Sequence, residues 1–94
     1  MNAEINTKIL DILKPFQPIR VGVFGSYSRG EMNDDSDIDI LYSFQKKITL
    51  FDLVGLKLDL EDALNRKIDL VSEKGINKYI KPYILKDLKI IYQE

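Results

Sequence analysis

The sequence contains no cysteine and no histidine. Without cysteine there are no disulfide bonds and no thiolate metal sites, which is compatible with a reducing environment, and we expect a cytoplasmic protein. Without histidine the chain lacks the usual near-neutral general base and the usual zinc ligand. Any metal ion must then be held by oxygen atoms, which favours a hard cation such as Mg²⁺ or Mn²⁺.

Long apolar runs and a strong charge bias are also absent. The formal net charge of −1 gives no broad basic face, so we expect no direct binding to nucleic acid. No apolar run approaches the roughly 18 residues that a membrane helix needs, and the N-terminus MNAEINTKIL does not resemble a signal peptide. The length of 94 residues suits a single domain over residues 1–94.

The hydrophobic pattern predicts an α/β fold, in which a small mixed β-sheet is flanked by helices. The clearest helix begins at Thr49, whose hydroxyl can cap it, with Asp52 three residues further on. Seven large apolar residues between 51 and 64 give this helix a broad apolar surface. The first half of the chain is expected to form a helix over 3–14, a strand over 19–24, a helical turn over 27–30 and a strand over 37–44. The second half is expected to form a helix over 49–64, a strand over 67–71, a turn over 76–79 and a helix over 83–92.

Asp37 and Asp39 form a D-x-D motif in the expected strand over 37–44. Residues two apart in a strand point to the same face, so these carboxylates would lie side by side and repel one another. A divalent cation would relieve that repulsion, so the spacing suggests a metal site. Most D-x-D pairs are solvated surface residues, but the isoleucines of this strand place its other face against a core.

Two further features favour a site for a nucleotide. Gly25 and Ser26 follow an apolar strand and begin a helical turn, where backbone amides and the serine hydroxyl can bind phosphate. The simpler interpretation is a strand-to-turn connection capped by Ser26. Asp69, in the strand over 67–71, either lies at an exposed sheet edge or joins the other aspartates by strand pairing, and three carboxylates suit two Mg²⁺ ions.

Together these residues form the pattern G-S-x10-D-x-D, and at this point the chain resembles a known family. The pattern is similar to the signature of the polymerase β-like nucleotidyltransferase superfamily, and GSYSRGEMNDDSDIDI resembles the minimal nucleotidyltransferases (MNT proteins) in particular. The resemblance implies that Gly25 and Ser26 hold the β- and γ-phosphates of ATP, and that Asp37 and Asp39 bind the metal ions. Asp69 would complete the metal site and help to deprotonate the acceptor hydroxyl.

Arg29 fits the family pattern S-x-x-R-G and would neutralise charge on the triphosphate. A surface ion pair with Glu31 or Asp34 explains this arginine equally well.

MNT proteins resemble antitoxins that act with HEPN-type ribonuclease toxins. The resemblance implies a protein adenylyltransferase that transfers AMP from ATP to a tyrosine of its toxin, as a type VII-like antitoxin. Two alternatives remain: a nucleotidyltransferase for small molecules, similar to the aminoglycoside-modifying enzymes, and a non-catalytic module that masks a toxin.

The chain after Asp69 is too short to form a separate acceptor domain. We therefore expect either a small acceptor held at the interface of a homo-oligomer, or an acceptor supplied by a second protein in a hetero-oligomer. Several apolar residues near the C-terminus belong either to the core, the interpretation we favour, or to a partner surface. They are Ile76, Tyr79, Tyr83, Ile84, Ile90, Ile91 and Tyr92.

Overall fold

A mixed four-stranded sheet forms the centre of the computed structural model, which describes residues 2–33 and 35–94. The strand order is β3-β2-β1-β4, in which β2 pairs with β3 in parallel and β1 pairs with both β2 and β4 antiparallel. The predicted fold class is therefore the observed one. The strands are β1 (Pro18–Phe24), β2 (Ile38–Phe44), β3 (Ile68–Ser72) and β4 (Lys89–Gln93).

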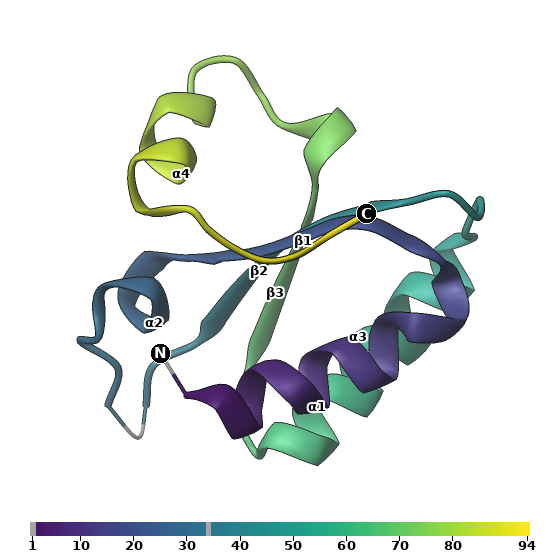
Figure 1. Ribbon diagram of the computed structural model, residues 1–94, viewed down its shortest axis with the longest axis horizontal. Helices are drawn as coiled ribbons and strands as arrows, with labels where there is room; N and C mark the ends of the chain where they lie inside the picture. The colour runs from purple at the N-terminus through teal and green to yellow at the C-terminus, as the bar shows by residue number, and fades with distance from the viewer. Residues whose placement is uncertain (1, 34) are drawn as a thin grey trace.

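Helices cover the sheet unequally. The long helices α1 (Ala3–Leu13) and α3 (Leu50–Leu64) pack side by side against one face, and α4 (Lys81–Asp87) lies over the other (Figure 1). The short helix α2 (Gly25–Arg29) leaves the end of β1 directly, and the chain then returns to the sheet as β2. Two 3-10 turns, Lys14–Phe16 and Glu73–Gly75, follow α1 and β3. The described helices include none that is both long and apolar enough to cross a membrane.

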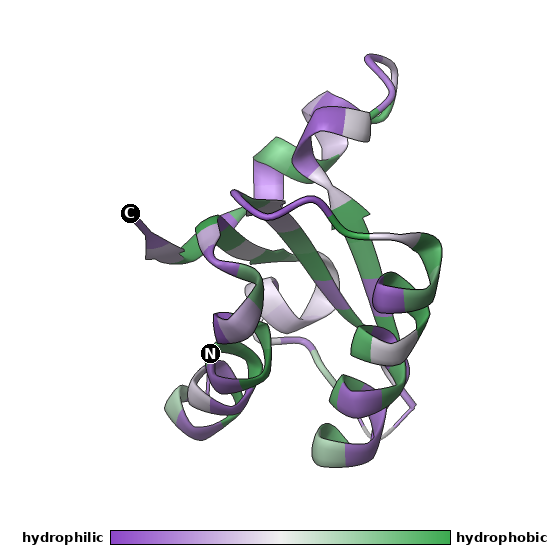
Figure 2. Cartoon of the chain, turned by 90° about the vertical axis from the view of Figure 1, so that its right-hand side faces the viewer, coloured by the Kyte–Doolittle hydropathy of each residue, from purple (hydrophilic) through white to green (hydrophobic). Residues whose placement is uncertain are grey.

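The hydrophobic core lies between the sheet and the pair α1 and α3 (Figure 2). Ile38 and Ile40 of β2 point into it, as the alternation of that strand predicts, while Asp39 points to the other face. The fully buried members of the core are Ile9, Leu13, Val21, Val23, Ile38, Ile40 and Leu60.

Helix α3 begins as its sequence predicts. The Oγ1 atom of Thr49 accepts a hydrogen bond from the Asp52 amide (3.1 Å), and the Asp52 carboxylate accepts one from the Thr49 amide (2.9 Å). Its expected broad apolar surface is only partly used, because Leu56 and Leu60 are its buried residues. The exposed large apolar residues of this helix are Leu50, Phe51, Val54 and Leu58.

The prediction of a final helix over 83–92 is wrong in its second half. Helix α4 ends at Asp87, Leu88 adopts an extended conformation, and the chain continues as β4 along the edge of β1. Residues 89–93 (KIIYQ) contain β-branched and aromatic side chains that suit a strand, and pairing satisfies backbone groups that β1 would otherwise expose at the edge. The turn expected over 76–79 is also displaced, since residues 73–75 form a 3-10 turn and residues 78–80 a hydrogen-bonded turn.

The preference for a core role is wrong for most of the C-terminal apolar residues. Ile84 is buried against the sheet, and Ile76 and Ile91 are partly buried. The exposed ones are Tyr79, Tyr83, Ile90 and Tyr92.

Candidate active site

Strand pairing brings two of the predicted site residues together at one end of the sheet. Asp39, the second residue of β2, pairs with Phe24 at the end of β1 and with Asp69 at the start of β3. Paired residues on neighbouring strands point to the same face, so the carboxylates of Asp39 and Asp69 share the face opposite α1 and α3. Asp37 lies immediately before β2.

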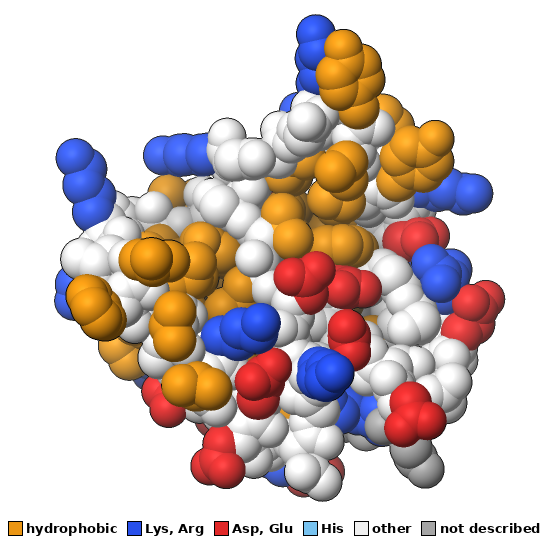
Figure 3. Space-filling view, turned by 180° about the vertical axis from the view of Figure 1, so that it is seen from behind, with side chains coloured by type: hydrophobic (Ala, Val, Ile, Leu, Met, Phe, Trp, Pro, Cys, Tyr) orange, Lys and Arg blue, Asp and Glu red, His pale blue; other side chains and the backbone are white. Residues whose placement is uncertain are grey.

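Asp39 is half-buried, whereas Asp37 and Asp69 are exposed. Burial raises the pKa of Asp39, and the negative charges of Asp69 and then Asp37 raise it further, to about 6. The positive charge of Arg29 lowers the same pKa. Acidic side chains gather in the middle of one face of the molecule, next to hydrophobic ones (Figure 3). The D-x-D motif and Asp69 therefore produce the charge repulsion that a cation would relieve.

Oxygen donors of the kind that hard cations prefer are thus present. In the conformation shown, the described residues 2–33 and 35–94 contain no three acidic side chains already arranged as ligands of one ion. Asp37 follows a turn in which the Ser36 hydroxyl accepts a hydrogen bond from the Asn33 amide (3.0 Å). Asp37 and Asp69, both exposed, are the carboxylates with room to turn toward a cation.

Gly25 lies directly against the half-buried carboxylate of Asp39. Its φ of 71° is in the left-handed region, and a Cβ atom added there would collide with Oδ2 of Asp39. Glycine is therefore required for two reasons, the backbone conformation and the space that Asp39 occupies. The N-cap residue Phe24 provides no side-chain cap, so the first backbone amides of α2 have no capping side chain among the described residues. Ser26 lies within the helix rather than at its N-cap, which corrects the interpretation of this residue as a capping serine.

Helix α2 is held at both ends. Gly30, with φ of 74°, ends it, and the Gly30 amide donates to the Tyr27 carbonyl oxygen (3.2 Å). Tyr27 is buried, and its hydroxyl donates to Oδ1 of Asn6 (2.7 Å) and accepts from the Asn2 amide (3.1 Å), which ties α2 to the start of α1. Burial raises the pKa of Tyr27.

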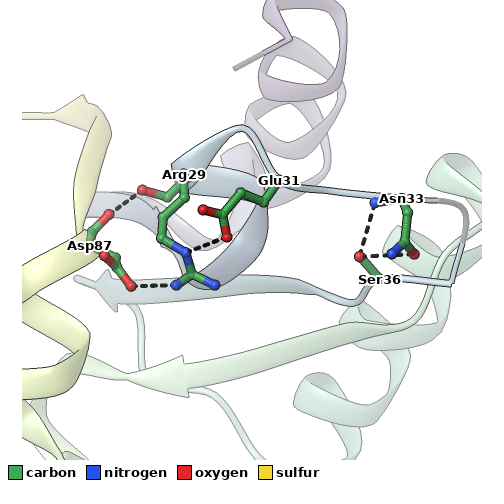
Figure 4. A network of polar contacts seen from close by, with 6 residues as sticks. Arg29, Glu31, Asn33, Ser36 and Asp87 are labelled. Carbon is green, nitrogen blue, oxygen red and sulfur yellow. Dashed lines mark hydrogen bonds and ion pairs between the residues drawn. The ribbon is translucent and has the colours of Figure 1, made fainter.

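The other side of α2 is tied to α4 (Figure 4). Arg29 forms ion pairs with Glu31 (3.0 Å) and with Asp87 (2.6 Å) at the end of α4. The buried Ser28 hydroxyl donates to the Asp87 carbonyl oxygen. The hydrogen bonds that the guanidinium of Arg29 donates to the carboxylates of Glu31 and Asp87 raise the pKa of Arg29, which keeps this group charged.

One of the two surface pairings predicted for Arg29 is therefore present, the one with Glu31. The alternative with Asp34 lies outside the described residues. Sequence reasoning missed the roles of Tyr27, Ser28 and Asp87 in placing α2. The first two lie inside the quoted motif, but no local pattern could have indicated Asp87, because its contact is made only in the folded chain.

A pocket of about 340 Å³ opens beside Asp69, between the sheet and the segment that leads into α4. Phe24 and Val71 line its sheet side, and Ile80 and Ile84 line the opposite wall. A larger cavity of about 540 Å³ lies at the other end of the sheet and contains none of the predicted site residues.

The chain matches one enzyme family over almost its whole length. Residues 7–94 match the family model described as "Polymerase beta, Nucleotidyltransferase". The chain belongs to this family and is a nucleotidyltransferase, so its substrate is a nucleotide. The family and the fold class expected from the sequence are thereby confirmed.

Proteins similar to this chain include protein adenylyltransferases and an antitoxin complex. The chain is 40% identical over 84 residues to MJ0435 of Methanocaldococcus jannaschii, a proposed protein adenylyltransferase, covering 89% of this chain and 90% of that protein. It is 38% identical over 68 residues to protein adenylyltransferase MntA of Thermococcus cleftensis, covering 72% of this chain and 69% of MntA. A solved structure of a tri-AMPylated Shewanella oneidensis HEPN toxin in complex with MNT antitoxin contains a chain of the same fold, with a TM-score of 0.79, 22% identity and coverage of 100% of this chain and 74% of that one.

Proposed function

We propose that this protein is an antitoxin that transfers AMP from ATP to a tyrosine hydroxyl of a HEPN-type ribonuclease toxin and thereby silences it. Two relatives that cover most of this chain are named as protein adenylyltransferases, which favours a protein acceptor over a small molecule. The structure of the modified Shewanella toxin pairs a chain of this fold with a partner of that kind.

The observation that carries the proposal is the contact between Gly25 and Asp39. The uncapped amides of α2, where we propose that a triphosphate binds, begin directly beside the carboxylate of Asp39. Asp39 is in turn the residue of β2 that pairs with Asp69 of β3. A phosphate-binding turn and a carboxylate cluster at the same end of a sheet are the two parts that phosphoryl transfer needs.

In this proposal, Gly25 and Ser26 hold the β- and γ-phosphates, through backbone amides and the serine hydroxyl. Asp37, Asp39 and Asp69 would hold Mg²⁺ or Mn²⁺, because carboxylate oxygens are the donors that these cations prefer. When bound, the ion stabilises negative charge on the transferring group and helps to activate the attacking hydroxyl.

The reaction forms one bond and breaks one bond. The oxygen of the acceptor tyrosine attacks the α-phosphorus, and the bond from that phosphorus to the oxygen bridging to the β-phosphate breaks. Pyrophosphate leaves from the side of Gly25 and Ser26, and the hydroxyl proton passes to the carboxylate of Asp69. The acceptor tyrosine is left esterified to AMP.

Arg29 acts chiefly as a positioning residue in this scheme. Its guanidinium is engaged by Glu31 and Asp87, so it holds α2 against α4 while adding positive charge near Asp39. Its direct contact with the triphosphate stays a prediction.

Intact mass spectrometry tests the proposal. The protein is purified with the neighbouring gene product that co-purifies, supplied with Mg-ATP, and both chains are weighed. We expect the partner to gain one or more AMP units with the wild type and none with Asp37→Ala. Asp35→Ala is the matched control, because it removes an exposed carboxylate two residues earlier and should leave the transfer unchanged. An unmodified partner in a stable complex would instead favour toxin masking.

A further inference from the structure

The pocket beside Asp69 has no assigned role in the proposed reaction. Its walls are mostly apolar, and Asp69 is the one ionisable group among the described residues that line it. Its volume of about 340 Å³ is near the lower end of the range for small-molecule sites, and it suits one ring system. The residues that form its walls are Phe24, Val71, Ile76, Ile80 and Ile84.

The order of the strands determines on which side of the proposed phosphate site this pocket lies. The proposed phosphate-binding turn follows β1, Asp39 lies on β2, and Asp69 lies on β3, in that spatial order. In an in-line displacement, the attacking oxygen approaches opposite the leaving group. If pyrophosphate leaves over the end of β1, the acceptor hydroxyl must arrive over β3, where Asp69 forms part of the pocket.

The segment that covers the pocket is strongly basic. Residues 74–86 contain four lysines and no acidic residue. The nearest acids on either side are already engaged, since Glu73 pairs with Arg20 (3.2 Å) and Asp87 pairs with Arg29 (2.6 Å). Lysine and hydrophobic side chains gather at the top of Figure 3, in the part of the molecule where Figure 1 places α4. None of these four lysines forms an ion pair with another described residue, so the rim carries net positive charge beside exposed aromatic groups, including Tyr79 and Tyr83.

We propose that this pocket receives the ring of the acceptor tyrosine, presented by an acidic segment of the partner protein that binds the lysines of residues 74–86. The inference rests on the proposed function and names the acceptor subsite within it. The ring would pack between Val71 and Ile80, which directs its hydroxyl toward Asp69, and the hydroxyl proton passes to that carboxylate as the bond to the α-phosphorus forms. Charge complementarity with the lysine rim would select acidic acceptor segments.

The first test changes the pocket wall. Ile80→Asp introduces a charge into the wall, and Leu58→Asp is its matched control, because Ile80 is 54% exposed and Leu58, on the outer side of α3, is 58% exposed. The probe is a short synthetic peptide with one tyrosine between glutamates, and AMP transfer is followed by mass. We expect Ile80→Asp to raise the KM for the peptide about tenfold, which is the size of effect expected when one aromatic packing contact is lost. The KM for ATP should be unchanged. Leu58→Asp should change neither.

The second test reverses the charge of the rim. Lys78→Glu combined with Lys81→Glu should raise the KM for the glutamate peptide about tenfold and weaken its dependence on salt. Lys57→Glu on α3 serves as the control. The wild type should modify the glutamate peptide in preference to the same peptide with lysines around its tyrosine.

Three results would overturn the inference. A higher KM for ATP in Ile80→Asp would place the nucleoside in this pocket. Equal modification of the two peptides, or no modification of the glutamate peptide, would contradict an acceptor tyrosine in an acidic segment. Failure of the proposed function is measured separately, as an absence of AMP on the co-purified partner.

Discussion

Replacing Gly25 with alanine tests how the fold creates the site. The substitution adds one methyl group at a residue where φ is 71° and where that methyl would meet the Asp39 carboxylate. Two separable effects follow. The first is backbone strain, because an L-residue in the left-handed region costs about 1–2 kcal/mol. The second is displacement of Asp39 or of the first turn of α2.

Gly30→Ala separates these two effects. Gly30 has almost the same backbone conformation, with φ of 74°, but a Cβ atom there meets nothing within 4 Å. Both variants should therefore lose about 1–2 kcal/mol in the free energy of unfolding, which corresponds to a decrease in Tm of about 5–10 °C for a domain of this size. Only Gly25→Ala should also move the carboxylate of Asp39 relative to the proposed phosphate-binding turn, and a misplacement of about 1 Å can cost 100-fold in rate.

The assay measures the rate of AMP transfer to the partner, at a temperature where both variants are folded, alongside thermal melting. We expect Gly25→Ala to lose about 100-fold in rate and Gly30→Ala to retain most of the wild-type rate. Equal rates in the two variants would refute the reasoning, because they would show that the space beside Asp39 does not matter for the chemistry.

Three further predictions concern stability. Without metal, the free energy of unfolding should fall by about 1–2 kcal/mol as pH rises from 4 to 7. The reason is that the pKa of Asp39 in the folded state, about 6, lies above its ordinary value of 3.8, so the protonated carboxyl stabilises the fold at low pH and this contribution is lost as pH rises through 6. Urea unfolding at several pH values should show this slope in the wild type and a flatter profile in Asp39→Asn. Mg-ATP should raise the Tm of the wild type by several degrees but not that of Asp37→Ala/Asp39→Ala, and equal shifts would argue against these aspartates as ligands. Leu60→Ala, at a fully buried position, should cost about 2–5 kcal/mol in urea unfolding, whereas Leu58→Ala on the exposed face of α3 should stay within about 0.5 kcal/mol; a similar cost for both would contradict the observed burial.

Local patterns account for much of the fold. Alternation in β2 predicted which side chains face the core, and the Thr49 capping box marked the start of α3, because both depend on residues a few positions apart. The same reasoning failed over 83–92. That segment satisfies a helical pattern as well as a strand pattern, and the open edge of β1 decides between them.

The sequence by itself determined the family and the D-x-D motif, because these depend on the local spacing of residues, whereas the requirement for glycine at residue 25 depends on the position of Asp39 in the folded chain. Only the tertiary structure placed Asp69 beside Asp39, tied α2 to α4 through Asp87, and left the basic segment over residues 74–86 as one wall of a pocket. The physical reason is that strand pairing and helix packing are contacts between distant parts of the chain. Their partners are chosen by which backbone edges and apolar faces the rest of the fold leaves open.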